Sequence, residues 1–271
     1  MNPFDSFLIN PILNLLLLFY KGFALLPIPG ALGFAIILLT VVIRLALWPL
    51  ISAQLKSTQK MAALKPHLDR IKSEHGHDKT RHQQEVSKLY KEHGVNPLAG
   101  CLPLIIQMPV FIALYQVLLK IVDFSKNDFL TNINDRLYSP FLFLEKIPDP
   151  SYLGVSLAAK PSDWRTVGFL ILLVPIVTGI LQYIQSKMMS PSAKSPAPVK
   201  KEGKEGLEDS MAQMQSQMIL IMPAMIAFFS YGFPICLSLY WNTFTIIGII
   251  QQYIISGAGG LNKYLPEKWR K

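Results

Sequence analysis

The sequence predicts an all-α polytopic membrane protein. It should have five transmembrane helices, a cytoplasmic helical hairpin and an N-terminal interfacial helix. Half of the 271 residues are hydrophobic, and they gather in five blocks, each about as long as the 20 residues that a helix needs to cross a bilayer. The basic residues gather in the segments between alternate blocks. Helices are favoured because a helix satisfies its own backbone hydrogen bonds in lipid.

The N-terminal segment, residues 1–30, is less apolar than the five blocks. Asp5, Asn10, Asn14 and Lys21 interrupt it, and two prolines end its apolar run. An amphipathic helix lying in the membrane interface is the favoured interpretation. A sixth span and a signal sequence stay open as alternatives, although no typical small-residue cleavage site follows the apolar run.

The five predicted spans alternate with four connections and a tail. The spans are residues 31–53, 98–120, 164–186, 213–231 and 234–256. The connections are a cytoplasmic hairpin at 54–97, an extracytoplasmic loop at 121–163, a cytoplasmic linker at 187–212 and a short outer turn at 232–233, with a basic tail at 257–271. "HGHDK" at 75–79 divides the hairpin into two helical arms.

The charge distribution predicts the orientation. The hairpin, the linker and the tail are basic, whereas the loop at 121–163 has four basic residues against six acidic ones. The positive-inside rule therefore places the N-terminus outside and the C-terminus in the cytoplasm. The basic residues behind the net charge of +9 are explained by this orientation, so we expect no specific nucleic-acid partner.

Arg44 stands in the middle of the first predicted span. A charge there costs about 2.5–3.5 kcal/mol on insertion scales. All acidic residues and histidines lie outside the spans, so Arg44 has no ionised partner in them. Snorkelling to the headgroups is the structural alternative to a functional role. The functional alternative gains support from polar residues in the inner halves of the spans, which predict a wet pocket open to the cytoplasm and closed outside: Thr40, Gln107, Gln182, Gln185 and Asn242.

Several function classes fit this pattern poorly. No acidic or histidine relay of a proton-coupled carrier lies in the spans, and no Gly-rich phosphate loop is present. We expect no catalytic residues, cofactor or metal site, because nothing in the spacing of the five histidines makes them converge. A small-anion or lipid carrier is the alternative function, and it should have inverted repeats, of which none is visible.

Three motifs resemble those of the YidC/Oxa/Alb membrane protein insertases. "NPLAGCLPLIIQMPVFIALYQVL" at 96–118 resembles the family's second core span. "TVVIRLALWPL" at 40–50 resembles its first, and "FPICLSLYWNTFTIIGIIQQYII" at 233–255 resembles its last. The chain is short and resembles the minimal bacterial type. It shows no lipoprotein-type signal at its start.

The resemblance implies an insertase that moves client transmembrane segments from the cytoplasm into the bilayer without ATP hydrolysis. Arg44 would supply the single positive charge of a hydrophilic groove, with Thr40 one turn away. Gln182 or Gln185 would add polarity, and Trp241 would contact the client helix. The implied partners are client membrane proteins and the lipid bilayer, with the Sec translocon and the ribosome left open. The implied location is the bacterial cell membrane.

Overall fold

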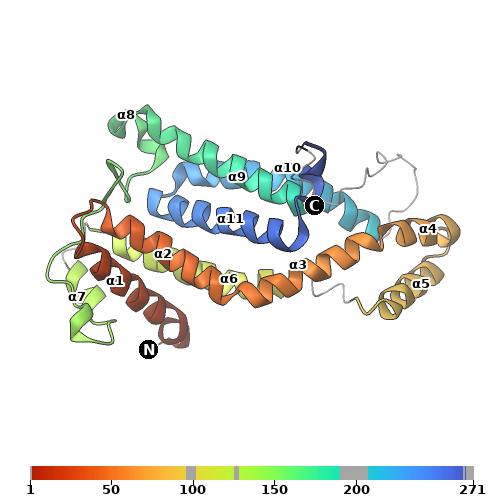
Figure 1. The fold of residues 1–271 in the computed structure, drawn as a ribbon, viewed down its shortest axis with the longest axis horizontal. Coiled ribbons are helices and arrows are strands. Elements are labelled where there is room, and N and C mark those ends of the chain that lie inside the picture. The colour runs from red at the N-terminus through yellow and green to blue at the C-terminus, as the bar shows by residue number, and fades with distance from the viewer. Residues whose placement is uncertain (1, 96–101, 125–127, 190–206, 265, 267–271) are drawn as a thin grey trace. The chain divides into compact units, whose positions relative to one another are not determined.

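The computed structural model describes residues 2–95, 102–124, 128–189, 207–264 and 266 (Figure 1). The described chain is mostly helical, and it divides into two compact units, each described by itself. The first comprises Met1–Ala46, Ile106–Gln182 and Pro223–Ile247, and the second comprises Leu47–Ile105, Tyr183–Met222 and Gly248–Lys271. The predicted linker at 187–212 lies largely outside the described residues, as do the Asn-Pro and Cys101 of the second motif.

Long helices supply most of both units. They are α1 (Asn10–Ala24), α2 (Ala31–Ala46), α3 (Trp48–Ala63), α4 (Lys65–His75), α5 (Lys79–Glu92), α6 (Leu102–Val122), α9 (Leu173–Met189), α10 (Leu207–Gly232) and α11 (Ile235–Ser256). The shorter elements are the π-helical turn η1 (Asp5–Ile9), α7 (Phe129–Asn134), α8 (Trp164–Val167), the 3-10 turns η3 (Pro140–Leu142), η4 (Pro161–Asp163), η5 (Phe169–Leu172) and η6 (Gly259–Tyr264), and the strands β1 (Ser151–Tyr152) and β2 (Val155–Ser156).

Only some of the helices are long and apolar enough to cross a membrane. Asp5–Ala24 and Phe169–Met189 meet that test, and α2 with α3 meets it as a bent pair. Gln107–Val122 and Ile219–Gly232 are shorter apolar helices. The described part of the chain therefore has two or three candidate spans by length and composition, and the arrangement of five spans stays a prediction.

Local chemistry explains where the helix boundaries differ from the predicted ones. The first predicted span breaks at Leu47, because Pro49 has no N–H to continue the hydrogen-bond ladder of α2. The third breaks at Gly168, whose φ of 112° favours glycine. The helix of the fourth predicted span, α10, begins at Leu207, whereas the predicted span starts at 213.

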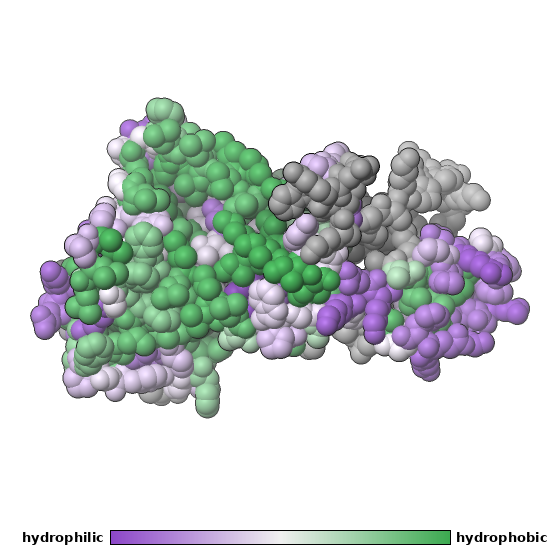
Figure 2. Space-filling view, in the orientation of Figure 1, coloured by the Kyte–Doolittle hydropathy of each residue, from purple (hydrophilic) through white to green (hydrophobic). Residues whose placement is uncertain are grey.

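The core of the first unit forms where α1 packs against α2. Ile9, Leu13 and Leu17 on one face of the N-terminal helix are fully buried, as are Leu32 and Ala35 of α2. Residues of α6 and α11 complete this cluster. Hydrophobic residues nevertheless cover much of the outer surface, most continuously over η5 and α9 (Figure 2). This distribution is expected of helices that face lipid.

In the second unit, α4 and α5 pack against each other as two arms joined at Gly76–Asp78. Leu64, Leu89 and Val95 form their small core. The Asp78 carboxylate caps α5 by accepting from the backbone N–H groups of Thr80 and Arg81 at 3.0 and 3.1 Å.

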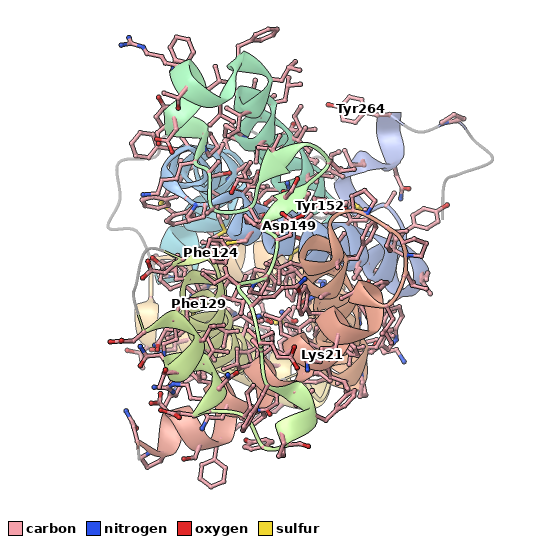
Figure 3. All side chains as sticks on the ribbon, turned by 90° about the vertical axis from the view of Figure 1, so that its left-hand side faces the viewer. Lys21, Phe124, Phe129, Asp149, Tyr152 and Tyr264 are labelled. Carbon is pink, nitrogen blue, oxygen red and sulfur yellow. The ribbon has the colours of Figure 1, made fainter. Side chains whose placement is uncertain are left out.

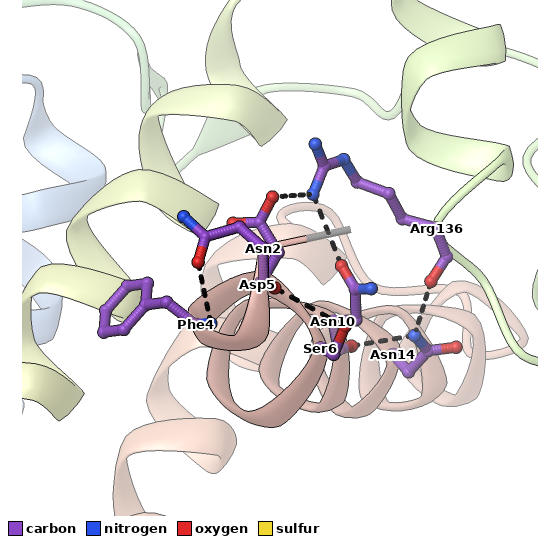
Figure 4. A network of polar contacts seen from close by, with 7 residues as sticks. All are labelled: Asn2, Phe4, Asp5, Ser6, Asn10, Asn14 and Arg136. Atoms are coloured by element: carbon purple, nitrogen blue, oxygen red, sulfur yellow. Dashed lines mark hydrogen bonds and ion pairs between the residues drawn. The ribbon is translucent and has the colours of Figure 1, made fainter.

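The extracytoplasmic loop of the prediction is attached to α1 by polar contacts (Figure 4). The Asn14 side-chain NH₂ donates to the carbonyl of Arg136 at 3.0 Å, and its side-chain oxygen accepts from the N–H of Tyr138 at 2.8 Å. The Arg136 guanidinium lies 3.4 Å from both the Asp5 carboxylate and the Asn10 side-chain oxygen. Lys21 donates to the carbonyl of Phe141. Asn10 and Asn14, which interrupt the apolar run, are therefore both buried and bonded.

A second attachment joins the loop to α2. The ring of Tyr152, labelled in Figure 3, lies against Gly30 and Gly33. A Cβ atom on Gly33 would lie 2.1 Å from the ring, and one on Gly30 would lie 2.8 Å from it. The same ring packs edge-on against Phe34, with centroids 5.4 Å apart. The two glycines thus form a notch that admits an aromatic side chain.

Candidate functional site

Arg44 is buried in the last turn of α2. The residue is 5% exposed, and its guanidinium carbon lies 4.0 Å above the centre of the Phe244 ring of α11. The Nε atom is buried and has no hydrogen-bond partner. Within the residues that the structure describes, no carboxylate forms an ion pair with Arg44. The cation is therefore supported by the face of an aromatic ring rather than by an anion.

Thr40 lies one turn before Arg44 and is also buried. Its hydroxyl donates to the carbonyl of Ile36 at 2.7 Å, within the same helix. Because the Thr40 hydroxyl already donates its hydrogen to this carbonyl, Thr40 offers no free hydrogen-bond donor beside Arg44.

Aromatic rings connect α11, the helix that carries Phe244, with α6. Tyr240 and Phe244 are one turn apart on α11, with ring centroids 6.0 Å apart. Phe111 of α6 lies 6.4 Å from Tyr240 and packs edge-on against Trp241 at 5.3 Å. The sequence alone does not indicate a role for Phe244, Tyr240 or Phe111. The spacing of Tyr240 and Phe244 could have indicated one aromatic face on α11, but not its partner on α2.

Gln182 and Trp241 are brought together by a hydrogen bond. The indole N–H of Trp241 donates to the side-chain oxygen of Gln182 at 3.2 Å, which joins α11 to α9.

Gln107 is partly exposed one turn before Phe111 on α6, and Asn242 has a buried side-chain oxygen with no hydrogen-bond partner. Gln185 belongs to the second unit. Of the predicted residues, only Gln182 and Trp241 share a direct polar contact.

Buried hydroxyl groups also lie among α9, α10 and α11. Ser230 contacts Ser238 at 3.0 Å and Thr178 at 3.5 Å. Close by, a Cβ on Gly179 would lie 3.0 Å from Ala227, so α9 and α10 approach closely there. These groups satisfy one another, as expected for contacts between membrane helices.

The described residues contain no group of three or more His, Cys, Asp or Glu side chains that could hold a metal ion. Two of the five histidines approach each other, since the rings of His67 and His93 are 6.1 Å apart.

The chain is similar to a family of bacterial membrane proteins. Residues 24–259 match the family described as the 60Kd inner membrane protein. The membrane protein insertase YidC of Pseudoalteromonas atlantica is 34% identical over 83% of this chain and 33% of its own length. That of Nitratidesulfovibrio vulgaris is 32% identical over 92% of this chain and 38% of its own.

A solved structure has a similar fold. It is a crystal structure of an active YidC insertase with the first transmembrane domain resolved, with 26% sequence identity and a TM-score of 0.54. The match covers 93% of this chain and 47% of that one. The chain thus spans about a third of the length of the curated relatives and about half of the solved structure.

Proposed function

Because this chain belongs to the 60Kd inner membrane protein family, the family of the membrane protein insertase YidC, we propose that it inserts client membrane proteins into the lipid bilayer. The observation that carries the proposal within the chain is Arg44, a buried cation in an apolar helix with an aromatic ring as its support. A structural arginine would be expected to have a carboxylate partner or to reach the headgroups.

The contact with Phe244 suits a transient interaction with a client. A cation–π contact contributes about 0.5–2 kcal/mol. Hydrogen bonds from a charged group contribute about 1.5–3 kcal/mol. An acidic client residue can therefore displace the guanidinium from the ring with a small net gain, and the reverse exchange releases the client. Arg44 would hold the polar end of a client briefly without trapping it.

The remaining polar residues would line the path of the client. Gln107 and the unpartnered oxygen of Asn242 offer hydrogen-bonding groups in the first unit. Gln182 and Trp241, joined to each other, would present a polar and an aromatic surface to the client helix. We propose that they form, with Thr40, a groove open to the cytoplasm and to lipid. Hydrophobic transfer of the client helix into lipid would supply the driving force, without ATP hydrolysis.

Reconstitution tests the function directly. Proteoliposomes that contain only this chain should insert a single-span client without ATP, because the proposed driving force is the burial of the client helix in lipid. Protection of the client's translocated tail from added protease measures insertion, and liposomes without the chain provide the control. Equal protection in the two kinds of vesicle would exclude autonomous insertase activity.

We also propose that α1 lies in the extracytoplasmic interface. By length and composition the Asp5–Ala24 helix could span a membrane. The distance from Asp5 to Lys21 along a helix is about 24 Å. Over this length the helix contacts residues 136–141 of one loop. The contacts are at Arg136 (Figure 4), Tyr138 and Phe141. If α1 crossed the bilayer, the loop would have to follow it into hydrocarbon. Interfacial placement keeps the loop's backbone in a polar environment.

Cysteine labelling tests the orientation. A cysteine placed at Asp135 should react with a membrane-impermeant maleimide added to intact cells, and one placed at His77 should react only after the membrane is permeabilised. The expectation follows from the basic residues of the hairpin and the acidic ones of the loop. Reaction at His77 but not at Asp135 in intact cells would reverse the proposed orientation.

A further inference from the structure

An exposed leucine occupies the tip of the hairpin formed by β1 and β2. Leu153 is 82% exposed and has a φ of 51°. It is followed by Gly154 with a φ of 82°, so both residues of the two-residue turn are left-handed. Such turns favour Gly, Asn and Asp, because a Cβ crowds the backbone in this conformation. In water, Leu153 would be unfavourable both for its backbone and for its side chain.

The hairpin tip adjoins the connection between α1 and α2. Tyr152, the residue before Leu153, lies in the notch formed by Gly30 and Gly33. The connection contains further exposed apolar side chains, with 86% of Leu25, 52% of Leu26 and 38% of Ile28 accessible. We name Leu25, Leu26, Ile28 and Leu153 the apolar rim.

We propose that the apolar rim inserts into the boundary between lipid headgroups and acyl chains, and so anchors the loop to the membrane surface. The rim lies where the chain enters α2, whose residues are apolar for several turns after Gly30. Contact with lipid therefore requires no partner beyond the bilayer that α2 enters. The inference depends on α2 being a membrane helix, and not on the insertase activity.

Lipid is favoured over a second protein because the rim is small and uniformly aliphatic. An anchor of this kind gains free energy in proportion to the apolar area that it buries, and needs no shape complementarity. In lipid, the side chain of Leu153 is stabilised, which can offset the unfavourable left-handed backbone.

A fluorescent depth measurement tests the location. Leu153→Cys, in a chain whose native cysteines are replaced by alanine, carries an NBD label and is reconstituted alone in vesicles. Nitroxide-labelled lipids should quench this label strongly and aqueous iodide should quench it weakly. A label at Asp135, an exposed polar position of the same loop, should show the reverse. Strong iodide quenching at 153 would overturn the proposal, and so would protection from both quenchers, which would indicate a protein contact.

The substitution Leu153→Asn gives a test by sign. Asparagine tolerates the left-handed conformation, so the turn should still form. If position 153 faces water, the substitution should raise the melting temperature of the chain in lipid nanodiscs. If it faces lipid, the loss of the anchor should lower it by a few degrees. A higher or unchanged melting temperature would contradict the proposal, independently of any result on insertion.

Discussion

Replacing Arg44 with alanine should slow the insertion of clients that have an acidic translocated tail by about tenfold or more. The reason is the loss of charged hydrogen bonds to the client, which contribute about 1.5–3 kcal/mol, and each 1.4 kcal/mol corresponds to a factor of ten. Arg44→Glu should be worse, because a buried carboxylate would repel the same tail. Arg44→Lys should keep much of the activity, since a positive charge without fixed geometry suits clients of differing sequence.

Matched clients separate the charge from other effects of the substitution. A client whose tail lacks acidic residues should lose less when Arg44 is replaced. Arg165→Ala is a suitable control, because Arg165 is exposed on α8 over the ring of Trp164, outside the proposed groove. Insertion is measured in proteoliposomes for each variant and client. If Arg44→Ala inserts both clients at the wild-type rate, Arg44 has a packing or snorkelling role and the proposed groove mechanism is wrong.

The Arg44→Lys variant separates a requirement for charge from a requirement for the geometry of the guanidinium. A bidentate interaction with one carboxylate would make Arg44→Lys nearly as inactive as Arg44→Ala. Stacking on Phe244 also favours the planar guanidinium, so lysine should have a weaker resting contact even where it retains activity. The lysine variant therefore distinguishes a client-binding charge from a geometric requirement.

Arg44 could be singled out as a candidate functional residue from the sequence, because charge and apolar periodicity are local properties. A single arginine among apolar residues is visible at once, and the three motifs were sufficient to identify the family, which the comparisons confirm. The contact between Arg44 and the ring of Phe244 could not be predicted from such local patterns. Phe244 follows Arg44 by 200 residues, and no local pattern on either helix names its partner.

The helix breaks show the same division between local and distant causes. Pro49 and Gly168 lie in the sequence where the helices end, so both could have been used to refine the boundaries. The buried state of Asn14 depends instead on Arg136 and Tyr138, which belong to a loop far along the chain. A polar residue in an apolar helix indicates an interfacial helix, whereas Asn14 also binds a second segment of the chain.

The substitution Gly33→Ala should destabilise the chain by about 1–3 kcal/mol, as overpacking of a filled site does. The added Cβ would lie 2.1 Å from the Tyr152 ring, which is too close for the two to coexist without movement. The loop should then shift away from α2, and thermal unfolding in lipid nanodiscs should occur at a lower temperature. Gly22→Ala is the matched control, because a Cβ there meets nothing within 4 Å and alanine favours the α1 helix.

A second substitution shows whether the steric conflict is the cause. In a Tyr152→Ala background the notch is empty, so Gly33→Ala should cost little there. The double-mutant cycle should therefore give a coupling free energy close to the whole cost of Gly33→Ala alone. An equal loss of stability in both backgrounds would mean that Gly33 is required for the conformation of α2 itself. In that case Tyr152 would only fill a notch that exists for another reason, and the loop would depend on its contacts with Asn14 for its attachment.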